Sequence, residues 1–197
     1  MLRRARAVLP FHAAVLLSLL SALAAAPAFG QVVINEIMQN PFAVADSAGE
    51  WFELHNAGLA DVDIDGWTIE DNDFDTFVIA NGGPLVVPAG GYLVLGNNAD
   101  SGTNGGATVD YQYSGMFLSN SADELVLLYT AQSEDDRVEC ENGPPFPDPT
   151  GASMSLEDPQ LDNAAGTNWC QSETPFGEVG RASRGAAKEC AGVVAPI

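Results

Sequence analysis

The sequence has few basic residues, few histidines and few cysteines. Seven Lys and Arg stand against 27 Asp and Glu among 197 residues, which gives a formal net charge of −20. Such a surface repels nucleic acid and anionic lipid, because both are bound mainly through Lys and Arg. The sequence therefore predicts no nucleic-acid partner, and we interpret the excess charge as an aid to solubility.

Histidine is nearly absent, and this limits the chemistry that can be expected. Besides His12, near the N-terminus, the chain has His55 alone, which excludes a zinc site built from several histidines. Glu36, Glu50 and Glu53 are candidates for a carboxylate acid–base pair. Glu50 and Glu53 have opposite parity on one strand and should face different sides, so we interpret these carboxylates as caps for backbone amides. The sequence predicts no enzyme; the alternative is a small calcium-dependent hydrolase that uses carboxylates.

No apolar run is long enough to span a bilayer, which needs about 20 residues. The run at residues 13–25 follows three arginines and precedes a small-residue cleavage site at residues 28–30, a pattern typical of a signal peptide. We expect residues 1–30 to be removed and the mature protein to be exported, to the extracellular space, cell surface or periplasm. Removal takes three of the seven basic residues, so the net charge becomes −23.

The three cysteines, Cys140, Cys170 and Cys190, leave one thiol unpaired if a disulfide forms after export. Cys170 and Cys190 both lie in a segment with few apolar residues to hold it in place. We predict a disulfide between them, whose loop of about twenty residues would contribute about 3 kcal/mol. Cys140 shares the strand parity of Val138, which suits a buried thiol.

Short apolar runs separated by turn residues are abundant. Residues 50–56 alternate Phe52 and Leu54 with Glu53 and His55, as in a strand with one buried face. Comparable runs follow at short intervals, which predicts an all-β sandwich of about eight or nine short strands within residues 31–141. Besides residues 50–56, the runs lie at residues 32–38, 62–69, 77–79, 92–95, 111–113, 125–129 and 136–140, with shorter apolar runs at 85–87 and 116–118.

Gly66 marks a change of strand parity. Val62 and Ile64 share one face, whereas the apolar positions beyond Gly66 are Trp67 and Ile69. A shift of one residue turns side chains to the wrong face unless the strand bulges, and glycine permits a bulge. We therefore expect a single strand that is kinked at Gly66.

Two stretches lack periodicity. Residues 96–108 contain small and polar residues only, which predicts a long surface loop and a candidate for function. Residues 142–197 are rich in Pro and Gly, and Pro disrupts regular strands, so we expect an irregular C-terminal segment that packs on the sandwich to about residue 176.

Acidic clusters provide weak candidates for a cation site. Glu70, Asp71, Asp73 and Asp75 lie in or beside one turn, and calcium takes six to eight oxygen ligands. The alternative is a solvated acidic hairpin tip. Residues 61–66 match the first half of an EF-hand loop, but the twelfth position is Asn72 instead of Glu, so we interpret that match as accidental. Calcium is the one cofactor considered, and we expect it to raise the thermal stability modestly.

Several aromatic residues would stack on sugar rings if they were exposed, although aromatics on a sandwich more often pack in the core or across strands. These residues are Trp51, Trp67, Tyr92, Tyr111 and Tyr113.

Four blocks, at residues 35–37, 50–56, 62–69 and 88–95, together resemble the lamin tail domain in its bacterial, secreted form. The resemblance implies an immunoglobulin-like β-sandwich and no catalytic set. It departs from the family in the tail, where Arg181, Arg184 and Lys188 appear and a Thr-Pro pair is missing. No heptad run is present, so a filament role does not follow. The resemblance implies that the fold is determined by Glu36, Trp51, Glu53, Leu54, Asn56, Gly66 and Trp67.

Together these features predict a non-enzymatic, exported binding or adhesion module, monomeric, with an unknown protein or an envelope glycan as partner. A purely structural surface protein is the other alternative.

Overall fold

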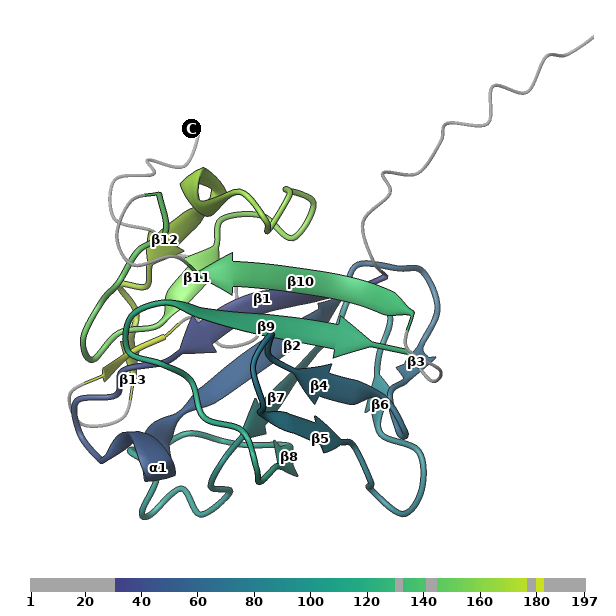
Figure 1. Cartoon of the computed structure of the whole chain (residues 1–197), viewed down its shortest axis with the longest axis horizontal. Coiled ribbons are helices and arrows are strands. Elements are labelled where there is room, and N and C mark those ends of the chain that lie inside the picture. Colours follow the sequence, from purple (N-terminus) through teal and green to yellow (C-terminus); the bar gives the residue numbers. More distant parts are fainter. Residues whose placement is uncertain (1–30, 130–132, 141–144, 177–179, 183–197) are drawn as a thin grey trace, which may run out of the picture.

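The computed structural model describes residues 31–129, 133–140, 145–176 and 180–182, which form a β-sandwich (Figure 1). The larger sheet has the order β12-β11-β1-β2-β7-β8, and the smaller has the order β10-β9-β4-β5. Neighbouring strands are antiparallel except β7 and β8, which are parallel. The larger sheet comprises β1 (Val32–Met38), β2 (Trp51–Asn56), β7 (Tyr92–Gly96), β8 (Tyr111–Gln112), β11 (Met154–Leu156) and β12 (Trp169–Gln171).

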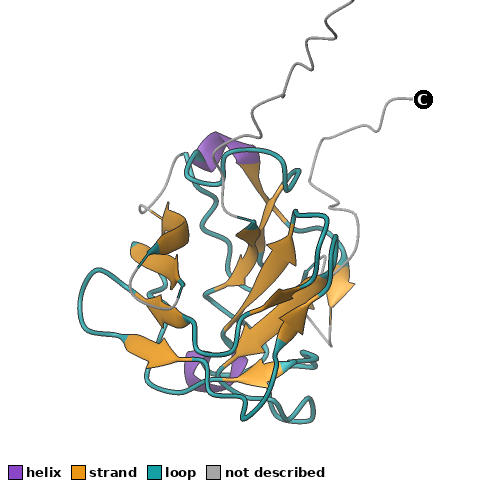
Figure 2. Cartoon of the chain, turned by 90° about the vertical axis from the view of Figure 1, so that its right-hand side faces the viewer, coloured by secondary structure: helices purple, strands orange, loops and turns teal. Residues whose placement is uncertain are grey.

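The smaller sheet comprises β4 (Thr68–Glu70), β5 (Thr76–Val78), β9 (Asp123–Leu128) and β10 (Glu134–Cys140). Two short pairs accompany the sheets, β3 (Val62–Asp63) with β6 (Val86–Val87), and β13 (Pro175–Phe176) with β14 (Gly180–Arg181). Within the described residues, helical structure is limited to α1 (Asp46–Gly49) and the 3₁₀ turn η1 (Gly166–Asn168), which lie at opposite ends of the view in Figure 2. The expectation of an all-β, immunoglobulin-like sandwich is confirmed.

The core between the sheets is built from the alternating apolar positions of the strands. Phe52 and Leu54 of β2 are fully buried there, together with Ile69 of β4 and Leu127 of β9. Trp67, which the sequence also placed in the core, is 6% exposed and packs edge-to-face on Tyr129, with ring centroids 4.7 Å apart. Burial of such side chains is the main stabilising contribution to a sandwich.

The outer face of the larger sheet is buried too, which the sequence did not predict. His55 was expected to face solvent, but it is 8% exposed and its ring lies 4.4 Å from that of Tyr92. Glu53 was expected on the same solvated face and is fully buried. A second apolar cluster covers part of this face, so β2 is shielded on both sides. That cluster contains Met38, Trp51, Val94, Ala107 and Ala182.

Residues 97–110 provide part of this cover and are held by one buried amide. Asn104 donates from Nδ2 to the carbonyls of Asn98 and Ala107, and its Oδ1 accepts from the amides of Gly106 and Ala107. The predicted surface loop is therefore a folded cover whose own Ala107 is buried in the apolar cluster that contains Trp51.

Two aspartates join the sheets where β1 passes β10. Asp136 Oδ2 accepts from Ile34 N at 2.6 Å and from Asn163 Nδ2 at 2.7 Å, and Asp135 Oδ2 accepts from Val32 N at 3.2 Å. Both strands have a register shift at this point. A bulge leaves a backbone amide without a ladder partner, and a carboxylate provides the missing acceptor.

Two sequence expectations about strands need correction. The chain does not form one strand kinked at Gly66, because β3 pairs with β6 and β4 belongs to the smaller sheet. Gly66 has φ of 82° and turns the chain between them, a conformation that glycine adopts without strain. The segment after residue 141 is also less irregular than expected, since β11 and β12 extend the larger sheet beside β1.

Candidate binding site: a cleft between two exposed phenylalanines

The most exposed aromatic side chains of the smaller sheet lie beside an acidic cleft. Phe74, in the turn between β4 and β5, is 95% exposed, and Phe117, in the segment before β9, is 59% exposed. Both line a cleft of about 470 Å³, which we call the phenylalanine cleft. Its remaining lining comes from residues 71–75 and 117–124, including Asp71, Asp73, Asp75, Asp123 and Glu124.

Three carboxylates from three elements fix one wall of the cleft. Asp75 Oδ2 accepts from the amide of Phe117 at 3.0 Å, and Glu50 Oε2 accepts from that of Leu118 at 3.1 Å. Asp123 Oδ2 accepts from the amide of Ser119. Hydrogen bonds from backbone N–H to carboxylates are stronger than neutral ones. Because consecutive amides are held in this way, Phe117 is exposed on a fixed segment.

Burial and neighbouring charge raise the pKa of two carboxyl groups in this wall. Glu50 is 2% exposed, and burial, aided by the charges of Asp46 and Asp123, raises its pKa to about 7. Burial also raises the pKa of Asp123, and the charges of Asp71 and Glu124 add to the shift. Desolvation and like charge both disfavour the ionised carboxyl. Both groups are therefore protonated more readily than an exposed carboxyl.

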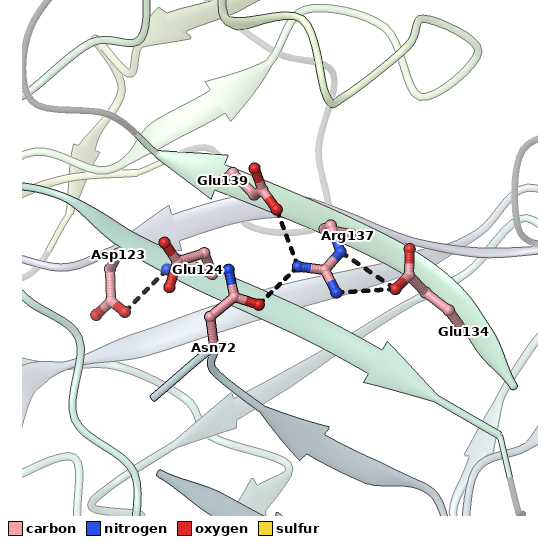
Figure 3. A network of polar contacts seen from close by, with 6 residues as sticks. All are labelled: Asn72, Asp123, Glu124, Glu134, Arg137 and Glu139. Atoms are coloured by element: carbon pink, nitrogen blue, oxygen red, sulfur yellow. Dashed lines mark hydrogen bonds and ion pairs between the residues drawn. The ribbon is translucent and has the colours of Figure 1, made fainter. Parts of the chain in front are cut away.

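Arg137 lies close to the cleft but its charge is already matched (Figure 3). Its guanidinium, on β10, makes ion pairs with Glu134 at 3.0 Å and Glu139 at 2.9 Å, and it donates to Asn72 Oδ1 at 2.9 Å. The carboxylate hydrogen bonds raise the pKa of Arg137. The Asn72 contact ties β10 to the β4–β5 turn, so the guanidinium supports the turn that carries Phe74.

The predicted cation residues are only partly brought together. Asp71, Asp73 and Asp75 line the cleft, whereas Glu70 lies on β4 and does not. Asp71 Oδ1 accepts from the amides of Asp73 and Asp75, as expected of an acidic hairpin tip. Within the described ranges no group of three or more His, Cys, Asp or Glu side chains is arranged to hold a metal. Calcium binding stays a prediction.

The aspartates of the EF-hand-like stretch bind backbone amides instead of converging. Asp61 Oδ1 accepts from Ala89 N at 3.0 Å, and Asp63 Oδ1 accepts from Leu85 N at 2.9 Å. Asp65 Oδ1 accepts from Asn81 N at 2.7 Å. The three carboxylates therefore fasten this part of the chain to residues 81–89, which agrees with the interpretation of the motif as accidental.

The three glutamates considered for catalysis occupy two places. Glu50 caps the Leu118 amide, as the sequence suggested, at the end of the larger sheet. Glu36 and Glu53 face each other across β1 and β2, and both are fully buried. Glu36 Oε1 accepts from Ser153 Oγ, and Glu53 Oε1 accepts from Asn35 Nδ2 at 2.7 Å.

The aromatics considered for sugar stacking are mostly packing residues. Trp51, Trp67 and Tyr113 are buried, while Tyr92 and Tyr111 are half-buried against other rings. Sequence reasoning missed Phe74 and Phe117. A phenylalanine between two aspartates in a turn was a usable signal for Phe74, whereas Phe117 resembles an ordinary strand residue.

Cys140, at the end of β10, is a free and buried thiol, as the sequence predicted. Its Sγ lies 4.0 Å from Met154 Sδ, and burial raises its pKa to about 12. Cys170 lies on β12, but Cys190 is outside the described residues, so the pairing stays a prediction.

The fold and the site define an immunoglobulin-like β-sandwich module with an acidic, phenylalanine-lined cleft. The sequence model described as the Lamin Tail Domain matches residues 25–141, more than half of the chain, and the chain belongs to that family. No curated protein matches it.

Among solved structures, the chain is similar to the crystal structure of a DUF4876 family protein from Bacteroides thetaiotaomicron. The TM-score is 0.50 with 11% identity, over 83% of this chain and 75% of that one. At this identity the likeness supports the fold alone. In the part of the chain that the structure describes, no helix is long and apolar enough to cross a membrane.

Proposed function

We propose that this protein is an exported, non-enzymatic binding module that acts at the cell envelope or in the extracellular space, and that the phenylalanine cleft is its binding surface. The observation that carries the proposal is the exposure of Phe74 and Phe117 on a wall fixed by carboxylates. Burying a phenylalanine is worth about 1.5–3 kcal/mol, so two exposed rings together favour association with a partner.

The binding experiment mixes labelled mature protein with isolated cell envelopes and measures the fraction of protein that is bound. We expect Phe74→Ser/Phe117→Ser to lose most of the bound fraction. The matched control is Phe42→Ser/Leu59→Ser, whose residues are 71% and 101% exposed elsewhere on the molecule. Equal binding by both double variants would place the binding surface elsewhere.

Export rests on the signal-peptide pattern of residues 1–30. Intact-mass measurement of the protein recovered outside the cytoplasm should give a chain that begins near Gln31. An uncleaved N-terminus would contradict export by this route.

The proposed bridge between Cys170 and Cys190 would follow export into an oxidising compartment. Non-reducing peptide mapping should recover the two cysteine peptides as one species and leave Cys140 alkylatable only after unfolding. A Cys140–Cys170 linkage, or a covalent dimer, would show this assignment to be wrong.

The absence of enzymatic activity and the monomeric state are parts of the same proposal. Screens with glycoside, phosphoester and peptide substrates, with and without a chelator, should give no turnover. Chelator-sensitive hydrolysis would favour the calcium-dependent hydrolase instead. Light scattering should report a monomer.

A further inference from the structure

We propose that the phenylalanine cleft binds a basic segment of a partner protein, in which Lys or Arg alternates with apolar side chains; this inference rests on the proposed function above. The cleft presents two kinds of surface within reach of one short peptide. Phe74 and Phe117 offer apolar faces, and the other residues that line the cleft include carboxylates.

Charge complementarity selects this occupant. Asp71, Asp73, Asp75, Asp123 and Glu124 all line the cleft, while the nearby Arg137 is paired with Glu134 and Glu139. The whole chain also carries a net charge of −20, so its long-range field attracts cations. The carboxylates that line the cleft would repel an acidic peptide, a nucleic acid or an anionic lipid.

The phenylalanine rings make the cleft more than a diffuse acidic surface. A cationic group placed over an aromatic face is attracted by the ring, and its aliphatic stem is covered by apolar contact. Leu118, although 5% exposed, and the exposed Ala122 also line the cleft. A peptide with cationic and apolar side chains would satisfy both surfaces at once.

The wall needs little rearrangement to accept such a peptide. The amides of residues 117–119 are already held by Asp75, Glu50 and Asp123, and the β4–β5 turn is held by Arg137 through Asn72. Binding to a preorganised surface avoids the entropy loss of ordering loops. The exposed side chains of Asp73 and Phe74 then remain available for contact.

The test uses fluorescence anisotropy with labelled synthetic peptides and the mature protein. A short peptide that alternates arginine with leucine should bind. Replacing its arginines with glutamate should abolish binding, and replacing its leucines with serine should weaken it by about tenfold or more, which corresponds to about 1.4 kcal/mol.

Protein variants locate the contact. Asp73→Asn/Glu124→Gln and Phe74→Ser/Phe117→Ser should each weaken peptide binding by about tenfold or more. The matched controls are Glu157→Gln/Asp158→Asn, which removes two exposed charges elsewhere, and Phe42→Ser/Leu59→Ser. Controls that weaken binding equally, or an arginine–serine peptide that binds equally well, would show only general attraction to an acidic protein and overturn the proposal.

The outcomes separate this inference from the proposed function. If envelope binding depends on Phe74 and Phe117 but the basic peptide neither binds nor competes, the partner class is wrong and the binding function stands. If released envelope glycan competes while the peptide does not, the occupant is a glycan. If the phenylalanine variants bind both the envelopes and the peptide as well as the wild type does, both proposals fail.

Discussion

Leu54 and Trp67 show what single side chains contribute to this core. Both side chains are buried in the main cluster, where Leu54 is fully buried and Trp67 is 6% exposed. Leu54→Ala or Trp67→Ala should lower the free energy of unfolding by about 2–5 kcal/mol, because the lost contacts leave a cavity. Urea denaturation measures the loss. The exposed Leu59→Ala should change stability by less than about 0.5 kcal/mol, and a loss below about 1 kcal/mol at Leu54 would contradict its core position.

Glu50 is the residue at which burial and charge conflict most clearly. Its side chain is buried and its pKa is raised to about 7, so at pH 8 the folded protein holds an unfavourable charge. Glu50→Gln keeps an oxygen that can accept from the Leu118 amide and from Asn97 Nδ2, both of which donate to Glu50 Oε2.

Glu50→Gln should therefore raise the free energy of unfolding at pH 8 by about 1–3 kcal/mol. The gain should disappear below about pH 4.5, where wild-type Glu50 is protonated in both states. Chemical denaturation at the two pH values measures it. The exposed Glu157→Gln serves as the control and should show no such pH-dependent gain.

At the scale of elements, the cover formed by residues 97–110 depends on one amide. Asn104 is 3% exposed and makes four hydrogen bonds within this segment. Asn104→Ala should lower the free energy of unfolding by about 2–4 kcal/mol, because buried backbone groups lose their partners. Asn98→Ala, whose side chain bonds are exposed, should lose less than about 1 kcal/mol. Equal losses would show that the segment is not held through Asn104.

The sequence was informative for strands with several alternating apolar residues and weak for the rest. β1 has the predicted bounds, and β2 begins one residue later than the predicted run and ends where it ends. β11 and β12 were missed because three residues between prolines and polar turns carry too little periodicity, although Met154 and Leu156 do point into the core. The separation of β3 from β4 depends on pairing with distant strands, which local parity cannot reveal.

The candidate site was predictable only in part for the same reason. The acidic turn at residues 71–75 was found from composition, but its partner segment at residues 117–124 lies far along the chain. Their apposition depends on sheet topology and on the bond from the Phe117 amide to Asp75. Burial of the outer sheet face, which hides Glu53 and His55, likewise depends on segments that lie elsewhere in the chain.

For the whole molecule, much of the acidic composition has a structural use. Carboxylates accept from backbone amides at the sheet junction, in the β4–β5 turn and along the cleft wall. Each provides an acceptor where strands end and the ladder leaves amides unpaired. The negative charge is therefore partly a consequence of a sandwich with short strands and long connections.

Stability should fall as the pH rises from about 4 to 7. The pKa of Glu50 is raised from 4.5 to about 7, and that of Asp136 from 3.8 to about 6, both chiefly by burial. Between about pH 4 and 7 the folded state then binds more protons than the unfolded state, so protonation stabilises the fold and this contribution is lost on titration. The free energy of unfolding should be about 2–4 kcal/mol higher at pH 5 than at pH 8.

Thermal denaturation across this range measures the effect. High salt is the control, because it screens repulsion between exposed carboxylates and leaves the buried contribution largely in place. A stability that rises from pH 5 to pH 8 would contradict the raised pKa values. Glu50→Gln should flatten part of the profile.

The alkylation rate of Cys140 can report how often the folded protein opens. Its thiol is buried at the end of β10 beside Met154, and its raised pKa keeps it protonated at neutral pH. Alkylating reagents attack the thiolate, so modification must wait for β10 to separate from the core. In the native protein, the alkylation rate divided by that of an unfolded thiol then gives the population of open molecules, without denaturant and at any temperature where the fold persists.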